Sequence, residues 1–415
     1  MRGLVTVVSA IVLVAACGRA PGGPLTANDY KVYEAVSDRN QIAVIDSHTH
    51  AIERWMQLGV PSSDWKHLYS VAGSSLGDVD PATGALIHSI ELPGNYELPL
   101  VTLSGMPGGL SQNGAWIAVE SFNRAPGESP TMSHFLVVST SFNLAPKRID
   151  LRGHFEFDAI SNDGYRLYLI EYGSAGSYRV RLYDVGAQQM NPQVVVDKTN
   201  PTESMSGLKL SGIPTQDGDF LYSIYARPTD TPFIHALNLT GPFASCIDVP
   251  GKGYQSDYNA LHWSIAMSPD GTKLYAANAA MGFLTEVVVA GTVPTGTTRS
   301  VKIDSGKSAS SFFAQDVEAK ELGSNAAVVS ADGKTLVTAG SAGIVFIDTR
   351  GLRVTGHALT DQTVWSLALS PDRKVLYVLN VNGTFTEVSM DTRKVGATFN
   401  PSAGNPLELM RVAAA

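Results

Sequence analysis

The chain has 415 residues, of which 44% are apolar and 16% are charged, and its net charge is −8 at pH 7. This composition is typical of a folded globular protein and excludes an intrinsically disordered chain. The charges form no basic or acidic run, so we exclude nucleic acid as a partner. The 39 glycines favour many tight turns over long helices.

The first seventeen residues read MRGLVTVVSAIVLVAAC. An arginine precedes an apolar run that is too short for a comfortable membrane span but typical of a secretory signal. The final VAAC resembles the bacterial lipobox, in which the cysteine is acylated and becomes the mature N-terminus. We therefore predict a lipoprotein signal peptide over residues 1–17, lipidation at Cys17 and a flexible tether over residues 18–29. A non-lipidated signal peptide with a chance cysteine is the alternative.

The stretch VIDSHTH at residues 44–50 resembles the start of a metal-dependent amidohydrolase, in which two histidines after a strand bind zinc. Such a site needs further ligands from later strands that are separated by helices, and no helical pattern separates the later histidines. The segment also aligns with VDPATGALI, which places Asp46 on Asp80 and Thr49 on Thr83. We therefore place SHTH in a hairpin turn and predict no metal site and no cofactor.

A short pattern recurs along the rest of the chain: Ser or Thr, a turn of the Pro-Asp-Gly type, then an apolar strand that often carries Leu-Tyr. Asp-Gly between apolar runs is a strong hairpin signal, because its backbone accepts the positive φ of a tight turn. A barely recognisable copy begins at Asn28. The other copies begin at Ser62, Ser111, Ser161, Thr215, Ser268, Ser330 and Ser370.

Most corners are followed by a second hairpin of the form apolar-x-apolar-Asp, as in LGDVDPATGALIHSIELPG from Leu76. Two hairpins per unit give four antiparallel strands, and this period is the signature of a β-propeller. We predict an all-β fold, a single propeller over residues 30–415 with eight four-stranded blades. Seven blades is the alternative. The C-terminal segment 407–413 is expected to supply the innermost strand of blade one and so close the ring.

The SPDGxxLYxxN and VIDxxT patterns resemble YVTN-type bacterial β-propellers, which are related to WD-repeat folds. The resemblance implies the fold and leaves the activity open, because such propellers include binding proteins and sugar-lactone hydrolases. The chain has no Cys-x-x-Cys-His motif, and we assign no catalytic residue.

The tight turns are expected on one face of the ring and the long connections on the other, where binding residues tend to lie. Aromatic and polar residues in or beside these connections are the candidate binding residues: Tyr96, Glu97, Arg124, Tyr254, Asp257, Tyr258, His262, Phe312 and Phe313. We predict a monomeric, extracytoplasmic binding or scaffold protein. Its membrane contact is the N-terminal lipid, and its ligand is an unknown protein, glycan or small molecule. A lactonase-like or other hydrolase at the channel mouth is the alternative.

Overall fold

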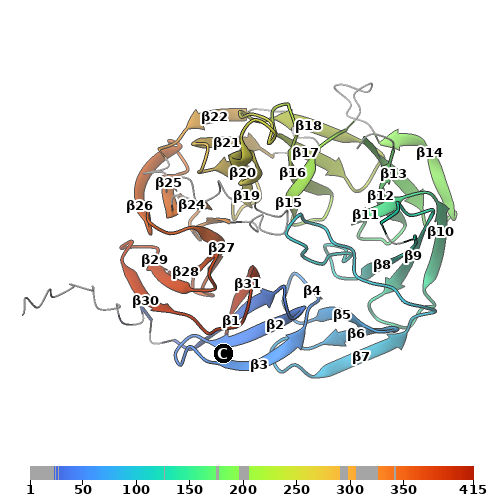
Figure 1. Cartoon of the computed structure of the whole chain (residues 1–415), viewed down its shortest axis with the longest axis horizontal. Helices are drawn as coiled ribbons and strands as arrows, with labels where there is room; N and C mark the ends of the chain where they lie inside the picture. Colours follow the sequence, from blue (N-terminus) through green and yellow to red (C-terminus); the bar gives the residue numbers. More distant parts are fainter. Residues whose placement is uncertain are drawn as a thin grey trace, which may run out of the picture.

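A computed structural model shows eight β-sheets arranged as blades around a ring (Figure 1). The described residues are 23, 25–26, 28–125, 127–173, 177–195, 205–289, 298–304, 326–340 and 343–415. The predicted signal peptide, with Cys17, lies outside them. In the part of the chain that is described, no helix has the length and apolar character needed to cross a membrane.

Each blade is an antiparallel sheet. In blades two to eight the strands follow one another in sequence from the ring centre outward, whereas the C-terminal strand is innermost in blade one (Figure 1). Listed from the ring centre, blade one contains β31 (Pro406–Ala414), β1 (Tyr30–Val36), β2 (Gln41–Asp46) and β3 (Ile52–Gln57), and blade two contains β4 (Val60–Pro61), β5 (Leu68–Ala72), β6 (Ser75–Val79) and β7 (Leu86–Glu91). Blade three contains β8 (Trp116–Asn123), β9 (Met132–Ser139) and β10 (Lys147–Arg152). Blade four contains β11 (Phe155–Ile160), β12 (Arg166–Tyr172), β13 (Tyr178–Asp184) and β14 (Gln189–Val195).

Blades five to eight follow the same order along the chain. They contain β15 (Leu208–Pro214), β16 (Phe220–Ala226), β17 (Phe233–Asn238) and β18 (Ala244–Asp248); β19 (Ser264–Met267), β20 (Lys273–Asn278), β21 (Phe283–Val288) and β22 (Thr298–Lys302); β23 (Ala327–Val329), β24 (Thr335–Gly340), β25 (Gly343–Asp348) and β26 (Arg353–Ala358); β27 (Val364–Leu369), β28 (Val375–Asn380), β29 (Phe385–Ser389) and β30 (Val395–Phe399). The prediction of eight blades is confirmed.

The C-terminal strand closes the ring, as predicted. β31 pairs with β1 over almost its whole length, from Tyr30 opposite Ala414 to Val36 opposite Pro406. The indole Nε1 of Trp365 in blade eight donates to the carbonyl of Leu407, 2.9 Å away. The first and last strands of the chain therefore pair in blade one, and the pairing covers an edge that would otherwise expose unpaired backbone groups.

Blade three differs from the others at its innermost position, where irregular chain takes the place of a strand. Glu97 and Leu110 make isolated bridges to Glu120 and Ile117 of β8. Between them the chain leaves the sheet as a small hairpin, which we call the insert hairpin (residues 98–108). Pro99 and Pro107, which lack an N–H group, lie in this hairpin and cannot extend the ladder. Figure 1 shows the hairpin crossing the middle of the ring toward β15.

The Ser/Thr and Asp/Asn of each repeated corner form one local hydrogen-bond unit. In the corner at Ser268, the hydroxyl donates to Asp270 Oδ1 (2.6 Å) and accepts from the backbone N–H of Lys273 (2.9 Å). The hydrogen bond from Ser268 lowers the pKa of the exposed Asp270 to about 2. Equivalent bonds occur in the corners that begin at Ser62, Ser111, Ser161, Thr215, Ser330 and Ser370.

The turn containing SHTH matches the PATG turn of blade two, as predicted. Asp46 Oδ1 accepts from the backbone N–H groups of His48 (2.9 Å) and Thr49 (2.6 Å), and Asp80 caps its own turn in the same way. His50 takes φ +61°, where Gly84 of the second copy takes +76°. The His50 ring stacks on Phe399 at 3.9 Å, so this histidine packs against blade eight.

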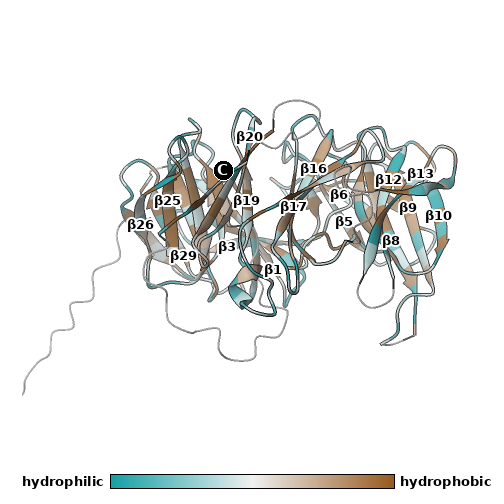
Figure 2. Ribbon diagram, turned by 90° about the horizontal axis from the view of Figure 1, so that it is seen from above, coloured by the Kyte–Doolittle hydropathy of each residue, from teal (hydrophilic) through white to brown (hydrophobic). Residues whose placement is uncertain are grey.

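The hydrophobic core is divided among the junctions between blades. The described residues form eight apolar clusters, and each cluster joins two neighbouring blades. In Figure 2 the strands carry most of the hydrophobic colour. The second strand of six blades contributes a buried tyrosine: Tyr33, Tyr69, Tyr168, Tyr222, Tyr275 and Tyr377. These tyrosines pack in the clusters between blades.

Candidate functional site

Three of the predicted binding residues line one pocket. Tyr96, Glu97 and Arg124 surround a cavity of about 220 Å³ together with Glu120 and Phe122 of β8. Two segments of the chain line this pocket. One is the connection from blade two to blade three, and the other is the end of β8. Both segments lie on the face that carries the long connections.

A backbone bridge places two glutamates side by side at this pocket. The N–H of Glu97 donates to the carbonyl of Glu120, and the N–H of Glu120 donates to the carbonyl of Glu97, both at 2.9 Å. Residues paired in this way lie directly opposite and extend their side chains on the same side of the sheet. Glu97 is exposed, whereas Glu120 is only 6% exposed. Two carboxyl groups with different environments therefore share one pocket.

The pKa of Glu120 is raised to about 8, chiefly by burial; the backbone N–H of Phe157 opposes this shift, and the nearby charges of Glu156 and Glu97 contribute to it. That N–H donates to Glu120 Oε2 at 3.0 Å and links blade three to blade four. Near neutral pH the Glu120 carboxyl is mostly protonated and can donate a hydrogen bond. Glu120 was not among the predicted binding residues. The feature that marks it in the sequence is a single acidic residue in the mostly apolar strand segment WIAVESF.

An aromatic and polar shelf continues from this pocket onto blade four. The His154 ring lies edge-on to Phe122 at 6.3 Å and stacks on Tyr172 at 4.4 Å. His154 Nε2 and the Tyr172 hydroxyl both contact the Glu156 carboxylate, at 2.9 and 2.8 Å. Tyr172 is 38% exposed, so a flat aromatic surface with polar neighbours faces solvent here.

A second hollow of about 240 Å³ adjoins the first, because Tyr96 and Glu97 line both. Its other walls include Gly73 of blade two and Leu100 of the insert hairpin. We call the two hollows together the loop-face groove. Tyr96 is only 8% exposed and packs in the core cluster between blades two and three. Tyr96, predicted as a binding residue, therefore forms a buried wall of the groove.

Four other predicted residues lie elsewhere, on the connection from blade five to blade six. Asp257 Oδ1 accepts from the backbone N–H of Asn259 and caps the short 3₁₀ helix η2 (Tyr258–Leu261), which ends at His262. Burial lowers the pKa of His262, and the Tyr254 ring packs against the core cluster of blades five and six. Of these four, Tyr258 is the most open, at 37% exposed. Phe312 and Phe313 lie outside the described residues.

Metal-ligating side chains do not gather anywhere in the described ranges: no group of three or more His, Cys, Asp or Glu residues could hold an ion there. His48 is exposed at its turn, and His50 is occupied by its stacking contact with Phe399.

No protein-family model matches the sequence, and no curated protein matches it. Solved structures do resemble the fold. The dihydro-heme d1 dehydrogenase NirN, in complex with DHE, is 12% identical, with a TM-score of 0.52 over 95% of this chain and 77% of that one. Apo AztD from Citrobacter koseri is 10% identical, with a TM-score of 0.53 over 93% and 98%. The periplasmic gluconolactonase PpgL from Pseudomonas aeruginosa is 17% identical, with a TM-score of 0.47 over 93% and 99%.

At these identities the likenesses show the fold alone. The fold and the groove together define the class: an eight-bladed β-propeller whose loop face carries an acidic and aromatic groove.

Proposed function

We propose that the protein is an exported, lipid-anchored binding protein of the YVTN type that recognises a glycan in the loop-face groove. The anchor is the acyl-modified Cys17, and the propeller stands on the extracytoplasmic side of the bacterial cell membrane as a monomer. The observation that carries the proposal is the convergence of Glu97, Glu120 and Arg124 beside exposed aromatic rings.

The chemistry of the groove suits a ligand with many hydroxyl groups. A carboxylate accepts hydrogen bonds, and a protonated carboxyl or a guanidinium donates them, so Glu97, Glu120 and Arg124 together match hydroxyls that do both. Tyr172 and Phe122 offer flat apolar surface at low entropic cost. Long connections on a rigid scaffold are also where binding residues concentrate.

Titration of the full-length protein in detergent with maltohexaose, cellohexaose and chitohexaose tests this proposal. We expect at least one oligosaccharide to bind, and Glu97→Gln and Phe122→Ala each to weaken its binding at least fivefold, because both residues line the groove. Glu128→Gln is the matched control, because Glu128 is exposed in the connection after β8 and has no place in the groove. The proposal fails if none of the three sugars binds, or if the groove variants bind as well as the control.

Hydrolysis in the same groove is a second candidate, and the buried Glu120 beside the exposed Glu97 favours it. A carboxyl held protonated near neutral pH can protonate a leaving oxygen, while a second carboxylate activates water on the other side of the bond. Incubation with the same oligosaccharides and an assay for new reducing ends separates the two candidates. Hydrolysis predicts product from the wild type and none from Glu120→Gln, whereas binding alone predicts no product from either.

A further inference from the structure

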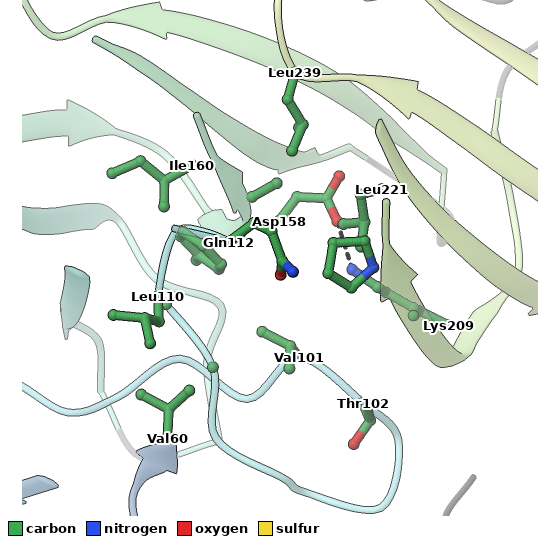
Figure 3. A pocket seen from close by; sticks show the side chains of 16 residues that line it. Val60, Val101, Thr102, Leu110, Gln112, Asp158, Ile160, Lys209, Leu221 and Leu239 are labelled. Atoms are coloured by element: carbon green, nitrogen blue, oxygen red, sulfur yellow. Dashed lines mark hydrogen bonds and ion pairs between the residues drawn. The ribbon is translucent and has the colours of Figure 1, made fainter. Parts of the chain in front are cut away.

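Another cavity lies inside the ring. It is separate from both hollows of the loop-face groove and shares no lining residue with them. Its volume is about 170 Å³. Figure 3 shows it between the insert hairpin and the innermost strands of blades four and five. Most of the wall is apolar, with contributions from Val60, Val101, Leu110, Ile160, Leu221 and Leu239.

The insert hairpin is held in place over this cavity. Its own strands pair through the N–H of Val101 to the carbonyl of Met106 (3.0 Å), and its tip reaches blade five through the N–H of Leu103 to the carbonyl of Lys209 (3.2 Å). Close approach requires glycine at position 108, because a Cβ there would lie 2.4 Å from Val101 Cγ1. The cavity is therefore bounded on this side by ordered backbone.

An ion pair contributes to the polar part of the cavity wall, which also includes Thr102 and Gln112. Lys209 Nζ donates to Asp158 Oδ1 at 2.8 Å, and the two side chains are 16% and 2% exposed. Both residues lie at irregularities of the innermost strands: the register of β11 shifts between Phe157 and Ala159, and that of β15 shifts between Lys209 and Ser211. A bulge redirects a side chain out of the alternating pattern, and bulges are common beside functional sites.

The ion pair leaves hydrogen-bonding capacity unused. Asp158 Oδ2 is buried and has no hydrogen-bond partner among the described residues. An ammonium group carries three donors, and the Asp158 bond uses one of those on Lys209. Burial of a carboxylate oxygen without a partner carries a cost in free energy. A bound molecule that donates to Asp158 Oδ2 would remove this cost.

We propose that this cavity binds a small monocyclic alcohol or phenol, whose hydroxyl lies between Asp158 and Lys209 and whose ring contacts Val101, Leu110 and Ile160. A hydroxyl is the simplest group that donates to the carboxylate and accepts from the ammonium at once. The size of the ring follows from the volume, because an apolar protein cavity of about 150 Å³ holds benzene. Anionic or cationic rings fit worse, since each would leave one member of the ion pair facing a like charge.

Five probes of similar size test the inference on the full-length protein in detergent: phenol, cyclohexanol, benzene, benzoate and benzylamine. Ligand-detected NMR and the shift of the thermal unfolding midpoint report their binding. We expect phenol and cyclohexanol to bind at least tenfold more tightly than the other three, because benzene leaves Asp158 Oδ2 without a partner. Equal binding of benzene and phenol, or no binding of either alcohol, would overturn the proposal.

Two kinds of variant complete the test. Leu110→Phe fills the cavity and should abolish phenol binding, and Leu144→Phe is its matched control, because Leu144 is exposed and does not line the cavity. Asp158→Asn should reduce phenol binding at least tenfold, and circular dichroism checks that the variant is folded. If Leu110→Phe still binds phenol, the molecule binds elsewhere and the assignment is wrong. Glu97→Gln should leave phenol binding unchanged, so failure here and failure of the glycan proposal are distinguishable.

Discussion

Glu34 in β1 gives the sharpest test of the energetics of ring closure. Its side chain is completely buried, and neither carboxyl oxygen has a hydrogen-bond partner among the described residues. Val32 and Val36, which extend on the same side of the strand, pack in the cluster between blades eight and one. Burial raises the pKa of Glu34 from 4.5 to about 8, and the charge of Asp38 adds to the shift. The carboxyl is therefore protonated in the folded protein at neutral pH.

The sign of the pH dependence follows from proton binding. Between pH 4.5 and 8 the unfolded chain releases the Glu34 proton and the folded chain keeps it, so raising the pH destabilises the fold. The free energy of unfolding should fall by about 1.4 kcal/mol for each pH unit, or about 5 kcal/mol in total. An unfolding entropy of about 2.1 cal/mol/K per residue gives about 0.9 kcal/mol/K for this chain, so the midpoint should fall by about 6 °C.

Glu34→Gln removes this titration and keeps the shape of the side chain. The variant carries a fixed, pH-independent offset from its amide group, so the informative quantity is the slope of the unfolding midpoint against pH from 4.5 to 9. We expect a shallower slope for Glu34→Gln than for the wild type, with the two curves converging or crossing as the pH falls. Some slope should remain, because burial also raises the pKa values of Glu120 and Glu408, to about 8 and about 7.

Differential scanning fluorimetry at constant ionic strength measures these curves. The exposed Glu128→Gln is the control and should run parallel to the wild type. If Glu34→Gln also runs parallel to the wild type, Glu34 does not stay protonated in the fold and the reasoning from burial is wrong.

Three further predictions concern the anchor, the SHTH turn and ring closure. Cys17→Ser should abolish incorporation of labelled palmitate and release the protein from the membrane fraction, and retention of the label would contradict lipidation. His50→Gly should change the unfolding free energy by less than about 1 kcal/mol, because relief of the positive φ offsets the lost stacking on Phe399. His50→Val should lower the unfolding free energy by about 2 kcal/mol or more, because a β-branched residue is strained at this φ. Denaturant titration measures both changes. Deletion of residues 406–415 should expose the edge of β1 and cause aggregation, measured by size-exclusion chromatography, and a monomeric, fully folded product would refute the closing role of β31.

The blade pattern was predictable because its determinants are local. The Ser268 corner is held by bonds to Asp270 and Lys273, two and five residues away, so the sequence motif contains the whole turn. The SHTH turn was assigned correctly for the same reason, since Asp46 caps the two residues that follow it closely. Strand alternation then made the blade count and the closing strand readable.

The site was only partly predictable. Tyr96, Glu97 and Arg124 were selected because they lie in or beside long connections, and they do line one pocket. Tyr254, Asp257 and His262 were selected by the same rule, yet they cap a short helix or pack on the core. Connection length shows where the chain is irregular but not whether a side chain faces a groove or its own backbone.

The sequence by itself determined the all-β fold, the eight corners and the segment that closes the ring, because these depend on hydrogen bonds within a few residues and on strand periodicity. Only the tertiary structure brought Glu97 opposite Glu120, carried the insert hairpin across the ring and paired Asp158 with Lys209 of the next blade. These contacts depend on strand register, on bulges and on the packing of one blade against another. The sequence carries no local mark of them, because the partners lie tens of residues apart.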